Sequence, residues 1–325
     1  MTQLTYLEAA VVGLVQGISE MFPVSSLGHS VLIPAIVGGS WARDLNVAAP
    51  ESPYLAFIVG LHVATAIALI IYFWRDWVRI IGGFFSSVRD RQVRTADQKL
   101  AWLIILATIP VGIAGLAFEH AFRVIFGKPA AAAAFLTVNG IILLAGEKLR
   151  RRASLAADAR ADAEREVADL RAIGRHSSGA QALRQRERAV TAMSDRRLSD
   201  IGYGQAVIIG SAQILGLLAG ISRDGVTMVA GMTRGLSRED AARFAFLLAT
   251  PVILAAGALK IPDLFGPLGH GIHGQILLGS LLSGAGAYAS VRFLVRYLRS
   301  RTLTPFGIYC LIAGLASMTY LSLIK

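Results

Sequence analysis

Two polar motifs interrupt apolar stretches of this 325-residue chain, and their side chains are of the kinds that bind phosphate. The first motif, QGISEMFPVSSLGH, spans residues 16–29. Gln16 and Glu20 are four positions apart, so a helix places both on one face. A carboxylate inside an apolar, membrane-type segment is costly, and its default interpretation is functional. We therefore expect Glu20 to line a site, either as a ligand of a divalent cation or as a base.

The second half of this motif predicts an anion site. Pro23 and Gly28 bracket a break in the helix, which leaves Ser25, Ser26 and backbone N–H groups free. His29 then begins a second half-helix, and hydroxyls and N–H groups at a helix N-terminus bind anions. Alternatively, the break is only a polar kink that its own serines hold together.

The second motif, AGISRDG, spans residues 219–225 and places an arginine in a glycine-bounded break. Arg223 in an apolar surrounding needs an anionic partner, and its planar fork matches phosphate oxygens. The alternative is an internal ion pair of Arg223 with Asp224 or Glu20 that closes the helix bundle.

Together the two motifs supply the parts of a phosphoryl-transfer site. Arg223 and backbone N–H groups would hold the phosphate charge, and Ser26 or His29 would attack phosphorus or activate water, an alternative that the residues leave open. His62, in a neighbouring apolar segment, is predicted to line the same site. The remaining candidates for phosphate binding are the small residues at the two breaks: Ser25, Gly28, Ser222 and Gly225.

The elements that position these motifs are membrane helices. The chain is 54% hydrophobic and 16% charged, whereas soluble domains carry about 25% charged residues. Its single cysteine, Cys310, excludes an internal disulfide and a cysteine-based zinc site. Six segments are long and apolar enough to span a bilayer: 54–74, 101–118, 131–147, 243–260, 274–295 and 305–324.

Two further apolar stretches, 6–37 and 203–235, contain the motifs and are each broken in the middle. Irregular backbone at membrane depth is tolerated only inside protein or beside a wet cavity, so we interpret both as re-entrant helix pairs. The motifs align at an offset of 197 residues, which matches Gly13, Gln16, Ser25 and Gly28 with Gly210, Gln213, Ser222 and Gly225.

The predicted fold is therefore an all-α integral membrane protein with six transmembrane helices and two re-entrant helix pairs, arranged as an inverted repeat. The repeats occupy 1–149 and 203–325, and a hydrophilic cytoplasmic linker occupies 150–202. The net charge of +11 comes from basic residues at the ends of apolar segments. Such residues mark the cytoplasmic side, so topology explains the charge better than nucleic-acid binding, which we exclude.

At both motifs the sequence resembles the undecaprenyl-diphosphate phosphatase family, the bacterial bacitracin-resistance proteins. Their first motif runs approximately EGxTEFLPVSSTGH and their second PGxSRSG, and the resemblance covers nearly all the chain except the 150–200 insert. It implies hydrolysis of undecaprenyl diphosphate to the monophosphate with Mg²⁺ or Ca²⁺, which recycles the lipid carrier for peptidoglycan synthesis and confers bacitracin resistance. It also implies a bacterial inner (plasma) membrane location, a site toward the outer face, and functional roles for Glu20, Ser26, His29 and Arg223, supported by Ser25 and Ser222.

Three residues depart from the family pattern. Gln16 replaces the first acidic residue, Leu27 replaces the threonine before Gly-His, and Asp224 replaces the second serine of SRSG. One hypothesis is that Asp224, brought opposite Gln16 by the inverted repeat, restores the lost metal-binding carboxylate. The alternative is a tolerated variant.

Two functions from different classes follow. The first is the phosphatase, with a polyprenyl diphosphate lipid as substrate and the bilayer as partner. The second is a polyprenyl-phosphate transporter or flippase with reduced or absent catalysis, since broken helices in inverted repeats are typical of transporters. The sequence leaves the oligomeric state open, with a homodimer among the states considered.

Overall fold

Apolar segments in a bilayer must satisfy their backbone hydrogen bonds internally, and this requirement favours helices. The computed structural model describes residues 4–45, 53–126, 128–156, 189, 191, 193–266 and 271–324. Over these residues the chain forms helices and no strands. The predicted all-α class is therefore confirmed.

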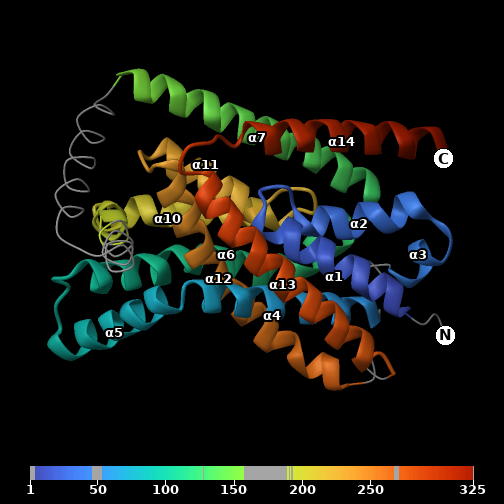
Figure 1. Cartoon of the computed structure of the whole chain (residues 1–325), viewed down its shortest axis with the longest axis horizontal. Coiled ribbons are helices and arrows are strands. Elements are labelled where there is room, and N and C mark those ends of the chain that lie inside the picture. The colour runs from blue at the N-terminus through green and yellow to red at the C-terminus, as the bar shows by residue number, and fades with distance from the viewer. Residues whose placement is uncertain are drawn as a thin grey trace, which may run out of the picture.

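Each of the six predicted spans coincides with one helix: α4 (Pro53–Tyr72), α6 (Ala96–Phe126), α7 (Pro129–Ala156), α12 (Arg238–Phe265), α13 (His273–Tyr297) and α14 (Thr304–Ile324). Five of them are long and apolar enough to cross a membrane, and α4 adds a sixth when it is taken together with α5 (Trp74–Asp90). The axes of α4 and α5 differ by 84°, so α5 leaves the direction of the bundle (Figure 1). Helix α5 was not predicted from the sequence.

The two motif regions form broken helix pairs, as predicted. The first pair is α1 (Tyr6–Met21) and α2 (Ser26–Val37), which a short helix, α3 (Gly39–Asp44), follows. The second pair is α10 (Tyr203–Ser211) with the 3-10 helix η1 (Ala212–Leu217), and then α11 (Arg223–Thr233). Both α10 and α11 begin at the offset of 197 residues from α1 and α2. The inversion of one half relative to the other stays a prediction.

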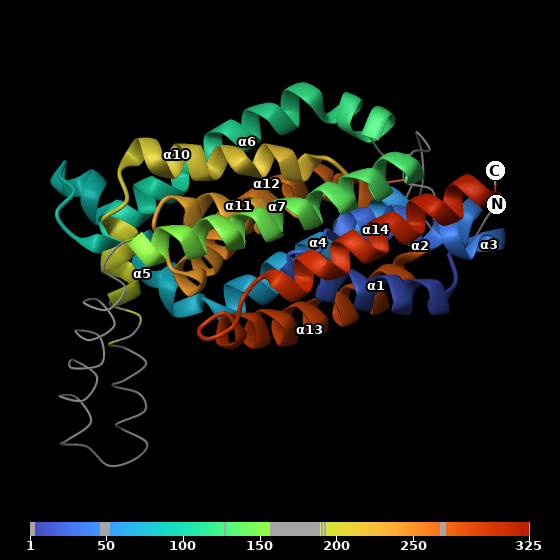
Figure 2. The same cartoon turned by 90° about the horizontal axis from the view of Figure 1, so that it is seen from above.

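Small residues let the first broken pair approach the rest of the bundle closely. α1 packs along α13, which in turn packs against α4. A Cβ atom added at Gly13 would collide with the backbone of Gly279, and one at Gly17 would collide with the backbone of Ser283. Contacts between small residues four positions apart are a common way to join membrane helices. Helices α7 and α14 also pack along each other, and Figure 2 shows them side by side.

The predicted linker over 150–202 lies largely outside the described residues, and its boundaries stay a prediction. Its described end, residues 193–199, is helical and is bound to the helix bundle by buried charges. Arg243 Nη2 on α12 lies 2.6 Å from Asp195 Oδ1 and 2.9 Å from Asp76 Oδ1 on α5. Arg79, also on α5, contacts both of these carboxylates. This end of the linker is therefore fixed to α5 and α12 rather than loose.

Candidate active site

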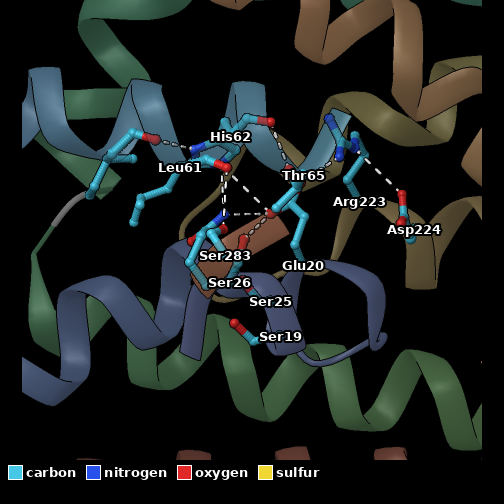
Figure 3. A network of polar contacts seen from close by, with 12 residues as sticks. Ser19, Glu20, Ser25, Ser26, Leu61, His62, Thr65, Arg223, Asp224 and Ser283 are labelled. Atoms are coloured by element: carbon cyan, nitrogen blue, oxygen red, sulfur yellow. Dashed lines mark hydrogen bonds and ion pairs between the residues drawn. The ribbon is translucent and has the colours of Figure 1, made fainter. Parts of the chain in front are cut away.

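One ion pair joins the two motifs. Glu20 lies in the last turn of α1, and Arg223 is the first residue of α11. Arg223 Nη2 donates a hydrogen bond to Glu20 Oε1 at 2.7 Å (Figure 3). The two side chains are 17% and 6% exposed, so the pair is shielded from solvent. Each charge of this buried pair compensates the other. Arginine has five N–H hydrogens, so the hydrogen bond to Glu20 leaves others that can bind an anion.

The second oxygen of Glu20 is the centre of a polar cluster. Ser26 donates its hydroxyl hydrogen to Oε2 across the break between α1 and α2. Gln16 Nε2 donates to the same oxygen at 3.0 Å from one turn earlier on α1. His62 Nε2, on α4, lies 3.6 Å from it. The structure therefore brings four of the predicted residues around one carboxylate.

The two helix breaks touch each other through Ser25 and Gly220. Ser25 caps α2 by accepting a hydrogen bond from the N–H of Gly28 at 3.2 Å, and the same Oγ accepts one from the N–H of Gly220 at 3.1 Å. Gly220 has φ +109°, which a residue with a side chain rarely adopts. A Cβ atom at Gly28 would lie 2.8 Å from the Cα of Gly220. Glycine at both positions therefore allows the breaks to meet.

Ser222 repeats the arrangement of Ser25 at the second break. It caps α11 by accepting a hydrogen bond from the N–H of Gly225 at 3.1 Å. Its own N–H donates to Oδ1 of Asn139 on α7 at 3.0 Å, and Asn139 Nδ2 donates to the carbonyl of Pro23 at 3.0 Å. Asn139 thus bridges the two breaks, which the sequence analysis missed. The signal was present, because a fully buried amide in an apolar span needs polar partners.

His29 faces a different partner from Glu20. Its Nδ1 lies 2.7 Å from the carbonyl oxygen of Ser25, and its Nε2 lies 2.7 Å from the hydroxyl of Tyr309 on α14. Because Nδ1 must donate to the carbonyl, Nε2 of the neutral ring carries the lone pair and accepts from the tyrosine. No contact in the described part of the chain joins His29 to Glu20. Nothing in the sequence around Tyr309 signalled this role.

An apolar groove runs beside His29. It is small, and it is lined by Val11, Val12, Val15, His29, Ser30, Ile33, Pro34 and Tyr54. Most of this lining is aliphatic, and His29, Ser30 and Tyr54 supply its polar groups.

The comparisons with known proteins agree with this geometry. A family profile described as bacitracin resistance protein BacA matches residues 9–316. The chain belongs to this family. Similar proteins are the undecaprenyl-diphosphatases of Mycolicibacterium paratuberculosis and Mycobacterium avium, each 59% identical over 98% and 99% of both chains, respectively. The undecaprenyl-diphosphatase 2 of Frankia alni is 55% identical over 97% of both chains. Neither the family description nor these names favours a transporter.

The family pattern has a carboxylate where this chain has Gln16, and Asp224 was the predicted substitute. Asp224 is 2% exposed, and neither carboxylate oxygen has a hydrogen-bond partner among the described residues. Its Oδ1 lies 3.5 Å from Arg223 Nε, and Figure 3 places Arg223 between Glu20 and Asp224. No contact within the described residues joins Asp224 to Gln16, so their pairing stays a prediction.

Oxygen atoms suited to a hard divalent cation gather beside Glu20. No group of three His, Cys, Asp or Glu side chains poised to hold a metal occurs among the described residues. However, Glu20 Oε2 and Ser26 Oγ adjoin Gln16, whose buried Oε1 has no hydrogen-bond partner among the described residues. Mg²⁺ and Ca²⁺ accept carboxylate, amide and hydroxyl oxygens, and both complete their shells with water and phosphate. The donor set therefore fits such a cation.

Proposed function

We propose that this membrane protein hydrolyses undecaprenyl diphosphate to undecaprenyl phosphate and inorganic phosphate, which recycles the lipid carrier for peptidoglycan synthesis. The observation that carries the proposal is the hydrogen-bonded pair of Glu20 and Arg223, which brings both family motifs into one buried site. The names of the full-length relatives supply the substrate. Bacitracin resistance follows from the same activity, since the family is described by it.

Arg223 is the group that binds the phosphate. It uses one Nη2 N–H group on Glu20, and its Nε faces Asp224 Oδ1 at 3.5 Å, so an anion would bind through the remaining N–H groups of the guanidinium. The planar fork of arginine can hold two phosphate oxygens at once. Backbone N–H groups at the starts of α2 and α11 add partial positive charge on the same phosphate.

Ser26 is the nucleophile that the geometry favours, with Glu20 as its base. The Ser26 hydroxyl already donates to Glu20 Oε2, which is the arrangement of an activated nucleophile. As Oγ bonds to the distal phosphorus, its proton passes to Glu20, and the bridging P–O bond breaks with its electron pair leaving on undecaprenyl phosphate. As the oxygen of a water molecule then bonds to phosphorus, the P–Oγ bond breaks and Oγ takes back the proton held by Glu20, while the protons of the water leave with the inorganic phosphate.

A divalent cation, Mg²⁺ or Ca²⁺, would be held by Glu20, Gln16 and Ser26. When bound, it neutralises phosphate charge and orients the transferred group. Asp224 would be a further ligand. Glu20, Gln16 and Ser26 would bind and orient the cation, while Arg223 carries the fixed positive charge of the site.

The location of the substrate follows from its two parts. The diphosphate reaches the polar cluster while the isoprenyl chain remains in the lipid. The protein lies in the bacterial inner (plasma) membrane with the site toward the outer face. The basic residues that follow the spans ending near 74, 147 and 295 would lie on the cytoplasmic side. The outward-facing site is what the family resemblance implies.

The test is phosphate release from undecaprenyl diphosphate by the purified protein in detergent. It is run with Mg²⁺, with Ca²⁺ and with a chelator, beside Ser26→Ala and Arg223→Ala. We expect cation-dependent release that both substitutions abolish. A folded protein that binds the lipid but releases no phosphate would contradict the proposal.

A further inference from the structure

Gln16 holds two neighbours with one amide group. Its Nε2 donates to Glu20 Oε2 at 3.0 Å and lies 3.2 Å from His62 Nε2. A side-chain amide nitrogen carries two hydrogens, so both contacts can be made at once. The amide oxygen, Oε1, is left buried and without a hydrogen-bond partner among the described residues. The two contacts therefore fix which end of the amide faces the carboxylate and which end faces away.

The neutral ring of His62 can act only as an acceptor toward Gln16. Its Nδ1 lies 2.9 Å from the carbonyl oxygen of Ile58, one turn earlier on α4. That nitrogen must carry the hydrogen, because a carbonyl oxygen only accepts. In the neutral ring Nε2 then holds the lone pair, and this is the atom that faces Gln16. The hydrogen bond consequently runs from residue 16 to residue 62.

A glutamate at position 16, as in the family pattern, would not fit this histidine. Its oxygens would meet the lone pair of His62 Nε2 and the carboxylate of Glu20, so acceptors would face acceptors. Leaving buried polar groups unpaired in this way is destabilising, because they lose their hydrogen bonds to water without gaining others. The glutamine at position 16 is thus a donor that matches the acceptor at position 62, and a glutamate there would not be.

We propose that His62 is a positioning residue that, together with Gln16, takes the place of the carboxylate missing from the first motif. The pair presents the neutral Oε1 of Gln16 to the substrate and cation, where the family pattern presents a negative oxygen. The site therefore has one negative charge fewer beside the phosphate, and it recruits its cation through Glu20. This inference rests on the proposed phosphatase activity.

The test exchanges the direction of the hydrogen bond. In Gln16→Glu combined with His62→Gln, the amide at position 62 donates to the new carboxylate. We compare kcat/KM, the cation concentration at half-maximal activity and the unfolding temperature in detergent for Gln16→Glu, His62→Gln and both together. A fourth protein, Gln16→Glu with His62→Leu, lacks any donor at position 62 and is the matched control.

We expect Gln16→Glu to lower kcat/KM at least tenfold, and His62→Gln to restore it to within about threefold, whereas His62→Leu does not. The repaired double variant should also reach half-maximal activity at a lower cation concentration than the unchanged protein, because its site is more negative. If Gln16→Glu by itself fails to fold, we expect the double variant with His62→Gln to recover a cooperative unfolding transition, and the double variant with His62→Leu not to recover it. That outcome supports the pairing as well.

The pairing would be overturned if the losses of kcat/KM in Gln16→Glu and His62→Gln simply multiplied when the two were combined. Equal recovery of kcat/KM with His62→Leu would overturn it too. Full activity of Gln16→Glu by itself would overturn it as well. The unchanged protein is assayed in parallel, and absence of phosphate release there would count against the proposed function instead. The two failures are therefore distinguishable.

Discussion

Arg223 Nη2 lies 2.7 Å from Glu20 Oε1, which connects the first residue of α11 to the last turn of α1. Each of these charges alone would be costly at this depth, and each compensates the other. Arg223 Nε also faces Asp224 Oδ1 at 3.5 Å, so the arginine contacts a carboxylate from each motif. These two contacts fix the orientation of the guanidinium, and we expect a phosphate to bind through its remaining N–H groups.

Arg223→Lys tests whether the planar fork is needed. Lysine keeps the charge but offers one point of contact instead of two parallel hydrogen bonds. We expect kcat/KM to fall about 100-fold, or about 2.7 kcal/mol of transition-state stabilisation, as measured by phosphate release. Arg292→Lys, at an exposed position of α13, is the control and should stay within about twofold. Equal activity of the two variants would show that Arg223 acts only as a diffuse positive charge.

Gly28→Ala tests the contact between the two breaks. The added Cβ would lie 2.8 Å from Gly220 Cα, so the backbone at one break must move. We expect destabilisation by about 1–3 kcal/mol and a clear loss of activity, followed by thermal unfolding in detergent and by phosphate release. Gly82→Ala on α5 meets nothing within 4 Å and should leave both unchanged or raise stability slightly. A fully active and stable Gly28→Ala would mean that the breaks need not touch.

Tyr309→Phe tests how His29 is held. The change removes the hydroxyl that lies 2.7 Å from His29 Nε2 and leaves the stacked ring in place. We expect kcat to fall about threefold to tenfold with little change in KM, since one hydrogen bond of about 1 kcal/mol is lost. Tyr320→Phe, which removes a hydroxyl on the same helix that donates to Ile36, should leave kcat unchanged. Equal effects from both substitutions would count against a specific role of Tyr309.

Arg243→Met tests the attachment of the linker. It leaves the carboxylates of Asp195 and Asp76 without one of their buried partners. We expect destabilisation by about 3 kcal/mol, measured by thermal unfolding in detergent. Arg89→Met removes an exposed ion pair on α5 and should cause no measurable change. An unaffected Arg243→Met would show that the described end of the linker is not held by these charges.

Much of the fold could be predicted because membrane helices carry their signal locally. Length and hydropathy identified all six spans, and Pro23 and Gly28 identified the first break. The bend between α4 and α5 was not predictable in this way, because the sequence after Tyr72 is amphipathic and its direction depends on packing. A hydropathy pattern states that a segment is apolar, not where it turns.

The site was predictable in its residue types but not in its atoms. Glu20 and Arg223 were recognised because charges in apolar segments are rare. Asn139 carried a weaker signal of the same kind, and Tyr309 carried none, since tyrosine is ordinary in a membrane helix. The contacts of Gln16 with His62 depend on the packing of α1 against α4, which no local pattern encodes.

The most direct measurement of the central claim, that the two motifs form one phosphatase site, is a double-mutant cycle on phosphate release. The unchanged protein, Glu20→Gln, Arg223→Gln and the double variant are assayed with undecaprenyl diphosphate and Mg²⁺ or Ca²⁺. We predict release by the unchanged protein, losses of at least about 100-fold in each single variant, and little further loss in the double variant, because both residues act as one unit. Losses that multiply, or a single variant with undiminished release, would contradict a shared site.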